Sequence, residues 1–154
     1  ANLCIGDIFR YSLQYKRAAE QAIETAAYFT DRRHSKAISL LRNEQQRIYK
    51  TIYSFVRPVI TCWNSYYYCF AAFNRSKRAL QLYSILYLNS NELSSKVRTA
   101  INSVAFWKNI DEITDCLLPF VSILDYLQHD ATNLFDVTYS FTYVAQQYED
   151  ETDG

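Results

Sequence analysis

The chain is organised around the stretch Pro58-Val59-Ile60-Thr61-Cys62-Trp63-Asn64-Ser65-Tyr66, which is followed by an aromatic run over residues 67–87. Proline cannot continue a helix, whereas the side-chain oxygen of Asn64 or Ser65 can accept a backbone N–H and cap a new one. The residues around the proline are β-prone, so a short extended segment is expected near residues 53–61. The stretch therefore predicts an extended lead-in, a tryptophan at a helix start, and then the longest helix of the protein.

The fold class follows from composition and periodicity. The 154 residues include only two glycines and two prolines, which argues against a sandwich or barrel with many turns. Apolar side chains instead recur at three- and four-residue intervals, as on the buried face of a helix. Helices are expected over residues 12–30, from the cap Ser35 to about residue 52, and over residues 66–87, 92–100, 104–127 with a kink at Pro119, and 134–147. The sequence predicts an all-α protein, a single irregular bundle of five to seven helices over residues 1–148, with a disordered acidic tail over residues 149–154.

Charge is distributed unevenly along the chain although the formal net charge is zero. Residues 1–78 contain 13 Lys and Arg against 5 Asp and Glu, and residues 79–154 contain 3 against 11. If the fold keeps the two halves apart, the basic half suits an anionic partner and the acidic half a cationic one. The alternative is that the halves pack together and neutralise each other.

Three motifs, in order, resemble those of hAT-superfamily transposases. Residues 61–66 are similar to the T-R-W-N-S-x-Y signature of that family, and residues 1–9 to its H-x-L-N-L-x-x-x-D-I-F segment. Residues 106–120 are similar to its segment W-x-x, about ten residues, then L-x-P and a hydrophobic residue. The chain departs from the pattern at Cys62, where the family has arginine, and it lacks the Cys-x-x-His pair.

The resemblance implies the helical region that interrupts an RNase H-like core. In that family the metal-binding carboxylates belong to the core, so two of them would precede Ala1 and the third would follow Gly154. We therefore expect no catalysis, no metal and no cofactor from this chain. By resemblance, Trp63 stacks on a displaced base, and the protein is nuclear; a secreted effector whose signal peptide has been removed is the alternative.

The remaining candidates for chemistry have simpler interpretations. The nearest acidic cluster, Asp111, Glu112 and Asp115, has the spacing of a solvated helix face. The four thiols lack ligand spacing and are interpreted as small buried hydrophobes, with a disulfide as the alternative. They are Cys4, Cys62, Cys69 and Cys116. No apolar run is long enough to span a membrane, and the two histidines have no ligand partner nearby.

Two functions of different class remain. The first is a protein-binding helical domain, a regulator or an effector derived from a transposase. The second is a DNA-binding module; its candidate contacts are Trp63, Arg57, Arg75, Lys77 and Arg78. A structural role for Trp63, packed inward against Phe55 or Tyr67, is the alternative to base stacking. Replacement of the family's arginine by Cys62 favours protein binding; the partner and the oligomeric state are left open.

Overall fold

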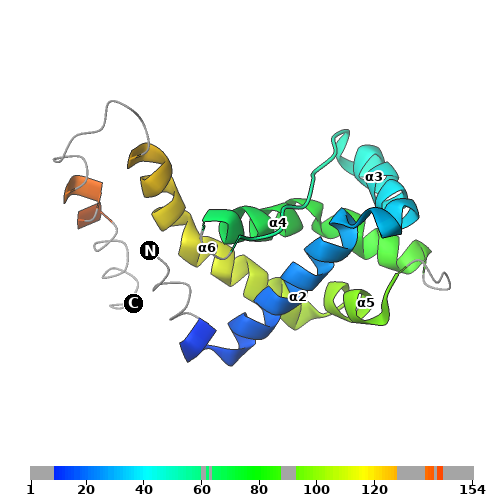
Figure 1. Cartoon of the computed structure of the whole chain (residues 1–154), viewed down its shortest axis with the longest axis horizontal. Helices are drawn as coiled ribbons and strands as arrows, with labels where there is room; N and C mark the ends of the chain where they lie inside the picture. Colours follow the sequence, from blue (N-terminus) through cyan, green and yellow to red (C-terminus); the bar gives the residue numbers. More distant parts are fainter. Residues whose placement is uncertain are drawn as a thin grey trace. The chain divides into compact units, whose positions relative to one another are not determined.

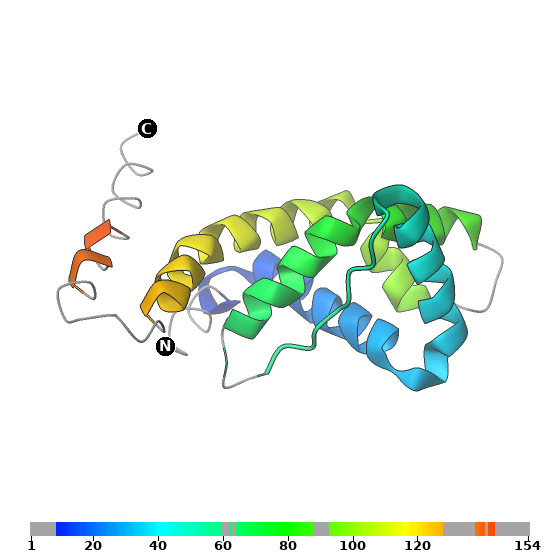
Figure 2. The ribbon, with the colours of Figure 1, turned by 90° about the horizontal axis from the view of Figure 1, so that it is seen from above.

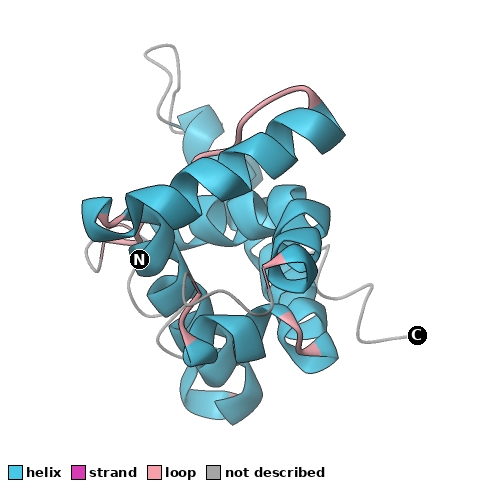
Figure 3. Ribbon diagram, turned by 90° about the vertical axis from the view of Figure 1, so that its right-hand side faces the viewer, coloured by secondary structure: helices cyan, strands magenta, loops and turns pink. Residues whose placement is uncertain are grey.

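The computed structural model describes residues 9–59, 62, 64–87, 93–127, 138–140 and 142–143. Every regular element in that part of the chain is a helix, apart from one isolated bridge between Val59 and Cys62 (Figure 3). The elements with defined bounds are α2 (Leu13–Thr30), the 3-10 turn η1 (Arg32–His34), α3 (Ser35–Tyr49), α4 (Asn64–Leu86), α5 (Ser95–Ile101) and α6 (Val104–Leu127); the α-helices are labelled in Figure 1. The predicted all-α class is confirmed.

Several helix ends lie where local chemistry predicts them. Ser12 precedes α2, and its hydroxyl accepts the N–H of Tyr15 at 3.4 Å. Ser94 caps α5 in the same way by accepting the N–H of Val97 at 3.3 Å. The long helix α4 begins at Asn64, within the organising stretch, so Asn64 and Ser65 are its first helical residues and not its cap, which corrects the sequence prediction. The helix α6 continues through Pro119.

The two ends of α3 correct the sequence prediction. Ser35 is its first residue rather than its cap, because Asp31 accepts the N–H of Arg33 and starts the 3-10 turn that leads into the helix. The helix ends at Tyr49, not near residue 52, because Lys50 adopts a left-handed conformation with φ of 60°. Ile52, predicted on its apolar face, therefore lies outside the helix and is 46 % exposed.

The core is built around α4. Its predicted apolar stripe is buried, with Phe70, Phe73, Leu80 and Tyr83 fully enclosed. The alanine-rich face of α2 is buried too, and it lets that helix pack closely against α4 and α5. An aromatic contact joins α4 to α6, because the rings of Phe73 and Phe106 have centroids 6.0 Å apart.

Residues 51–58 connect α3 to α4 without forming a helix, as the sequence predicted for the region around Pro58. We call this stretch the connecting segment; in Figure 2 it runs beside α4 without coiling. Exposure alternates over residues 52–56, with Ile52, Ser54 and Val56 exposed and Tyr53 and Phe55 partly buried. That period of two is the pattern of an extended backbone with one covered face.

The chain divides into two compact units, residues 1–114 and 115–154. The predicted single domain, residues 1–148, spans both. Residues 138–140 and 142–143 of the predicted last helix are helical, and the acidic tail lies outside the described residues. No helix in the described part of the chain is long and apolar enough to cross a membrane.

The basic and acidic halves of the sequence meet within the first unit. Lys77 pairs with Asp111 at 3.3 Å, and Glu24 pairs with Lys96 at 3.4 Å. Both pairs are partly exposed, so each contributes little to stability. Only the first pair joins a cation of the basic half to an acid of the acidic half, and it supports partial neutralisation, which was one of the two alternatives. The second pair joins an acid of the basic half to a base of the acidic half.

Candidate functional site: a groove beside the connecting segment

Two of the cations predicted to contact DNA have partners within the protein. The Arg57 guanidinium donates from Nε to Thr30 Oγ1 at 2.8 Å and from Nη2 to the carbonyl of Ala27 at 3.0 Å. These acceptors belong to the last turn of α2, where carbonyls lack helical partners and a positive charge is favourable. Arg57 therefore ties the connecting segment to the end of α2.

Lys77 is also engaged. Besides its ion pair with Asp111, its Nζ lies 5.4 Å from the centroid of the Trp107 ring. The indole is itself fixed, because its Nε1 donates to the carbonyl of Ile101 at 2.6 Å. This ammonium thus has a carboxylate and an aromatic face as neighbours.

The other predicted contact residues are distributed differently. Arg75 and Arg78 lie one turn apart on α4, are exposed, and make no hydrogen bond or ion pair with any described residue. Trp63 lies outside the described residues. Of the five predicted residues, these two arginines are therefore the described ones that are exposed and have no partner within the described part of the chain.

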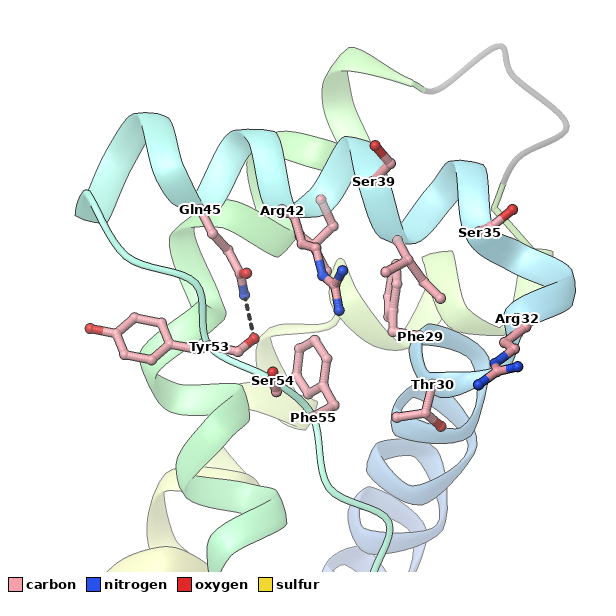
Figure 4. A pocket seen from close by; sticks show the side chains of 12 residues that line it. Phe29, Thr30, Arg32, Ser35, Ser39, Arg42, Gln45, Tyr53, Ser54 and Phe55 are labelled. Carbon is pink, nitrogen blue, oxygen red and sulfur yellow. Dashed lines mark hydrogen bonds between the residues drawn. The ribbon is translucent and has the colours of Figure 1, made fainter.

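A groove of about 610 Å³ lies elsewhere, between α3 and the connecting segment (Figure 4). We call it the α3 groove. Its α3 wall consists of Ser35, Ile38, Ser39, Leu41, Arg42 and Gln45. Its other walls consist of Tyr53, Ser54 and Phe55 from the connecting segment and Phe29, Thr30 and Arg32 from the end of α2 and from η1.

The connecting segment is anchored along the groove by polar contacts. Gln45 is 1 % exposed, and its amide nitrogen donates to the carbonyl of Tyr53 at 3.0 Å and to Ser76 Oγ at 3.0 Å. The hydroxyl of Ser65 accepts the N–H of Val59 at 2.8 Å, beyond the far end of the segment. Buried polar groups are costly without partners, so these bonds hold the backbone in one position.

Phe55 anchors the middle of the same segment. Its ring lies between Phe29 and Phe73, with centroid distances of 5.8 Å and 4.8 Å. Aromatic contacts of this kind add to the stabilisation from burial. The groove is therefore bounded by a stretch of backbone that is already fixed before any partner arrives.

The backbone of the segment nevertheless has unused hydrogen-bonding groups. The N–H groups of residues 52–57 donate to no described residue, and of their carbonyls only that of Tyr53 accepts a bond from one. Edges of this kind can pair with another extended chain. The segment thus borders the groove as a single unpaired strand.

The α3 groove is electropositive. Arg32 and Arg42 line it, both exposed and without a described ion pair, and no acidic residue lines it. Asp31, next in sequence to Arg32, is already bound by Arg33 at 2.6 Å, and that hydrogen bond lowers the pKa of Asp31 to about 2. Figure 4 shows the Arg42 guanidinium pointing into the space between α3 and Phe55.

Sequence reasoning missed this site for identifiable reasons. Arg42 was not among the candidate contact residues, but it lines the groove together with Leu41 of the same helix. The one available signal was Gln45, a polar residue within the apolar periodicity of α3. Its partners, Tyr53 and Ser76, are 8 and 31 residues away, so the bonds depend on tertiary structure.

The sequence prediction for the thiols and the acidic cluster can be compared with the described residues. Cys62 and Cys69 are free thiols; Cys69 is buried as predicted, whereas Cys62 is exposed, which corrects its assignment to the core. Cys116 is only partly buried, and Cys4 lies outside the described residues. The described part of the chain contains no group of three or more His, Cys, Asp or Glu residues placed to hold a metal ion.

No protein-family model matches this chain, and no match is found among curated proteins or solved structures. The relationship to hAT transposases stays a prediction that rests on the three sequence motifs.

Proposed function

We propose that this chain is a protein-binding module and that it holds a peptide segment of its partner in the α3 groove. The observation that carries the proposal is a preformed groove with a fixed, unpaired backbone along one wall. Recognition by addition to an exposed strand edge is a recurring mode of peptide binding. A volume of about 610 Å³ is also within the range of sites that enclose small ligands or a few side chains.

The anchoring contacts support the same proposal. Because Gln45 and Phe55 fix the segment in the free protein, less ordering entropy is lost when a peptide binds. Much of the groove lining is apolar, and its two arginines are free to pair with a ligand. A partner segment can therefore gain binding free energy both from burial of apolar side chains and from ion pairs within the same groove.

Blocking the groove from either wall is expected to weaken peptide binding. Random peptides of about ten residues displayed on phage would be selected against the protein, and the best would be synthesised with a fluorophore. Their affinity would be measured by fluorescence polarisation for Ser39→Trp and Ser54→Trp, which place a large side chain at exposed positions on opposite walls. Each variant should weaken binding at least about tenfold, or about 1.4 kcal/mol.

The matched control is Asn43→Trp, an exposed position of the same helix that does not line the groove. It should bind the peptides as tightly as the unmodified protein. Peptides that bind all three variants equally, or a selection that yields no binding peptide, would overturn the proposal.

A second candidate function, DNA binding, is supported by the exposed and unpaired Arg75 and Arg78. If both contact phosphates, the double variant Arg75→Gln/Arg78→Gln should bind hairpin and duplex DNA more weakly, with the salt dependence of log K reduced by about two. Gel-shift titrations at two salt concentrations would measure this, with Arg32→Gln/Arg42→Gln as the control of equal charge. Absence of any binding below about 10 µM at low salt would exclude this function.

A further inference from the structure

We propose that the ligand of the α3 groove is an acidic peptide that binds in an extended conformation and pairs with the backbone between Tyr53 and Arg57. This inference rests on the proposed function and specifies its ligand. The peptide adds as a strand beside the connecting segment, and its carboxylates pair with Arg42 and Arg32. The occupant is a segment of a partner protein with at least one Asp or Glu.

The orientation of the connecting segment supports backbone pairing. The carbonyl of Tyr53 faces α3, because it accepts a bond from Gln45 on that helix. In an extended backbone, residues two apart direct their N–H and C=O to the same edge. The N–H and C=O of Phe55 therefore face the groove as well, and neither is bonded to a described residue.

The side chain of Phe55 is independent of that pairing. It is committed to Phe29 and Phe73, so a ligand can use the backbone of Phe55 without displacing its ring. Gln45 and Tyr53 close one end of this edge. Arg57, bonded to the last turn of α2, fixes the other end. The edge is thus short and rigid, suited to a few residues of added strand.

Charge complementarity indicates an acidic rather than a neutral or basic peptide. The groove has two unpaired arginines and no acid, and Arg33 already occupies the adjacent Asp31. The N-terminal end of α3 adds to the positive potential. Its first residue, Ser35, lines the groove, and the first turn contains no acidic residue and no side-chain cap. Guanidinium groups pair well with carboxylates, often through two parallel hydrogen bonds.

The first test concerns charge. Peptides selected by display should be enriched in Asp or Glu, and the double variant Arg32→Gln/Arg42→Gln should bind them about tenfold more weakly. The control Arg75→Gln/Arg78→Gln removes the same charge from α4, outside the groove, and should bind as the unmodified protein does. Raising the salt concentration should weaken binding to the unmodified protein more than binding to the groove variant.

The second test concerns the backbone and leaves the protein unchanged. Each peptide nitrogen of one selected peptide would be methylated in turn, which removes one donor at a time. Strand pairing predicts a period of two, with losses of about tenfold at alternate positions and little effect between them. A peptide bound as a helix would lose affinity at every interior position, and one bound by side chains alone at none; either result would overturn the pairing.

Failure of this inference is distinguishable from failure of the proposed function. In one outcome, the selected peptides lose binding to Ser39→Trp and yet carry no acidic residue and bind Arg32→Gln/Arg42→Gln normally. That result would overturn the acidic ligand but keep the groove as a binding site. Binding that Ser39→Trp and Ser54→Trp leave intact would overturn the proposed function itself. Replacing the peptide's aspartate by phosphoserine should change affinity little; a gain above about tenfold would reassign the ligand to a phosphopeptide.

Discussion

Replacement of Phe73 by alanine is expected to lower the free energy of unfolding by about 3 to 5 kcal/mol, as for other large aromatic truncations in a core. Phe73 is fully buried in α4 and contacts Phe55 of the connecting segment at 4.8 Å and Phe106 of α6 at 6.0 Å. Its removal leaves a cavity where three elements meet. Urea or guanidinium unfolding followed by circular dichroism measures the loss.

The matched control is Arg75→Ala, two residues further along α4 and exposed. It should change the free energy of unfolding by no more than about 0.5 kcal/mol. A Phe73→Ala variant as stable as this control would contradict the arrangement in which one ring joins α4, α6 and the connecting segment.

Cys69 is expected to resist alkylation in the folded protein by about a thousandfold relative to the unfolded chain. Burial raises the pKa of this thiol from 9.0 to about 12, and the thiolate is the reactive form. The exposed Cys62, seven residues earlier, serves as the internal control and should react without unfolding. Treatment with iodoacetamide at pH 8, followed by mass spectrometry of the two peptides, measures both rates. Equal rates at the two thiols would contradict the burial of this face of α4.

The same pKa difference predicts a loss of stability in alkaline solution. Below pH 9 the thiol is protonated in both states, so nothing is lost. As the pH rises from 9 towards 12, the unfolded chain releases the proton while the folded protein retains it, and stability falls by about 1.4 kcal/mol per pH unit. Between pH 8 and pH 10 the unmodified protein should therefore lose about 1.4 kcal/mol more than Cys69→Ala.

Much of the fold was predictable because its causes are local. The serine that caps α2, the proline before α4 and the apolar stripe of α4 are each encoded within a few residues. The predicted ends of α3 were wrong because local backbone conformations that the pattern did not reveal set where the helix begins and ends. The bond from Arg33 N–H to Asp31 started a 3-10 turn, and the left-handed Lys50 ended α3 early.

The candidate site was not predictable in the same way. Charge and resemblance pointed to Arg57 and Lys77, but both side chains have partners within the protein. Arg57 binds the end of α2, and Lys77 contacts Asp111 and Trp107. Their partners are 27 or more residues away in sequence, so a linear pattern does not reveal them. Arg42 was not selected as a candidate because the helical pattern alone does not show which neighbouring surface a side chain faces.

The sequence by itself determined the class of structure and the positions of its main helices, because helix propensity, capping and apolar periodicity act over a few residues. It also determined that an extended segment would interrupt the helices near Pro58. Only the tertiary structure decided which backbone and side chains remain available to a partner. That outcome depends on contacts distant in sequence, such as Gln45 with Ser76 and Phe55 with Phe29, which fix the connecting segment beside α3 and leave its edge unpaired.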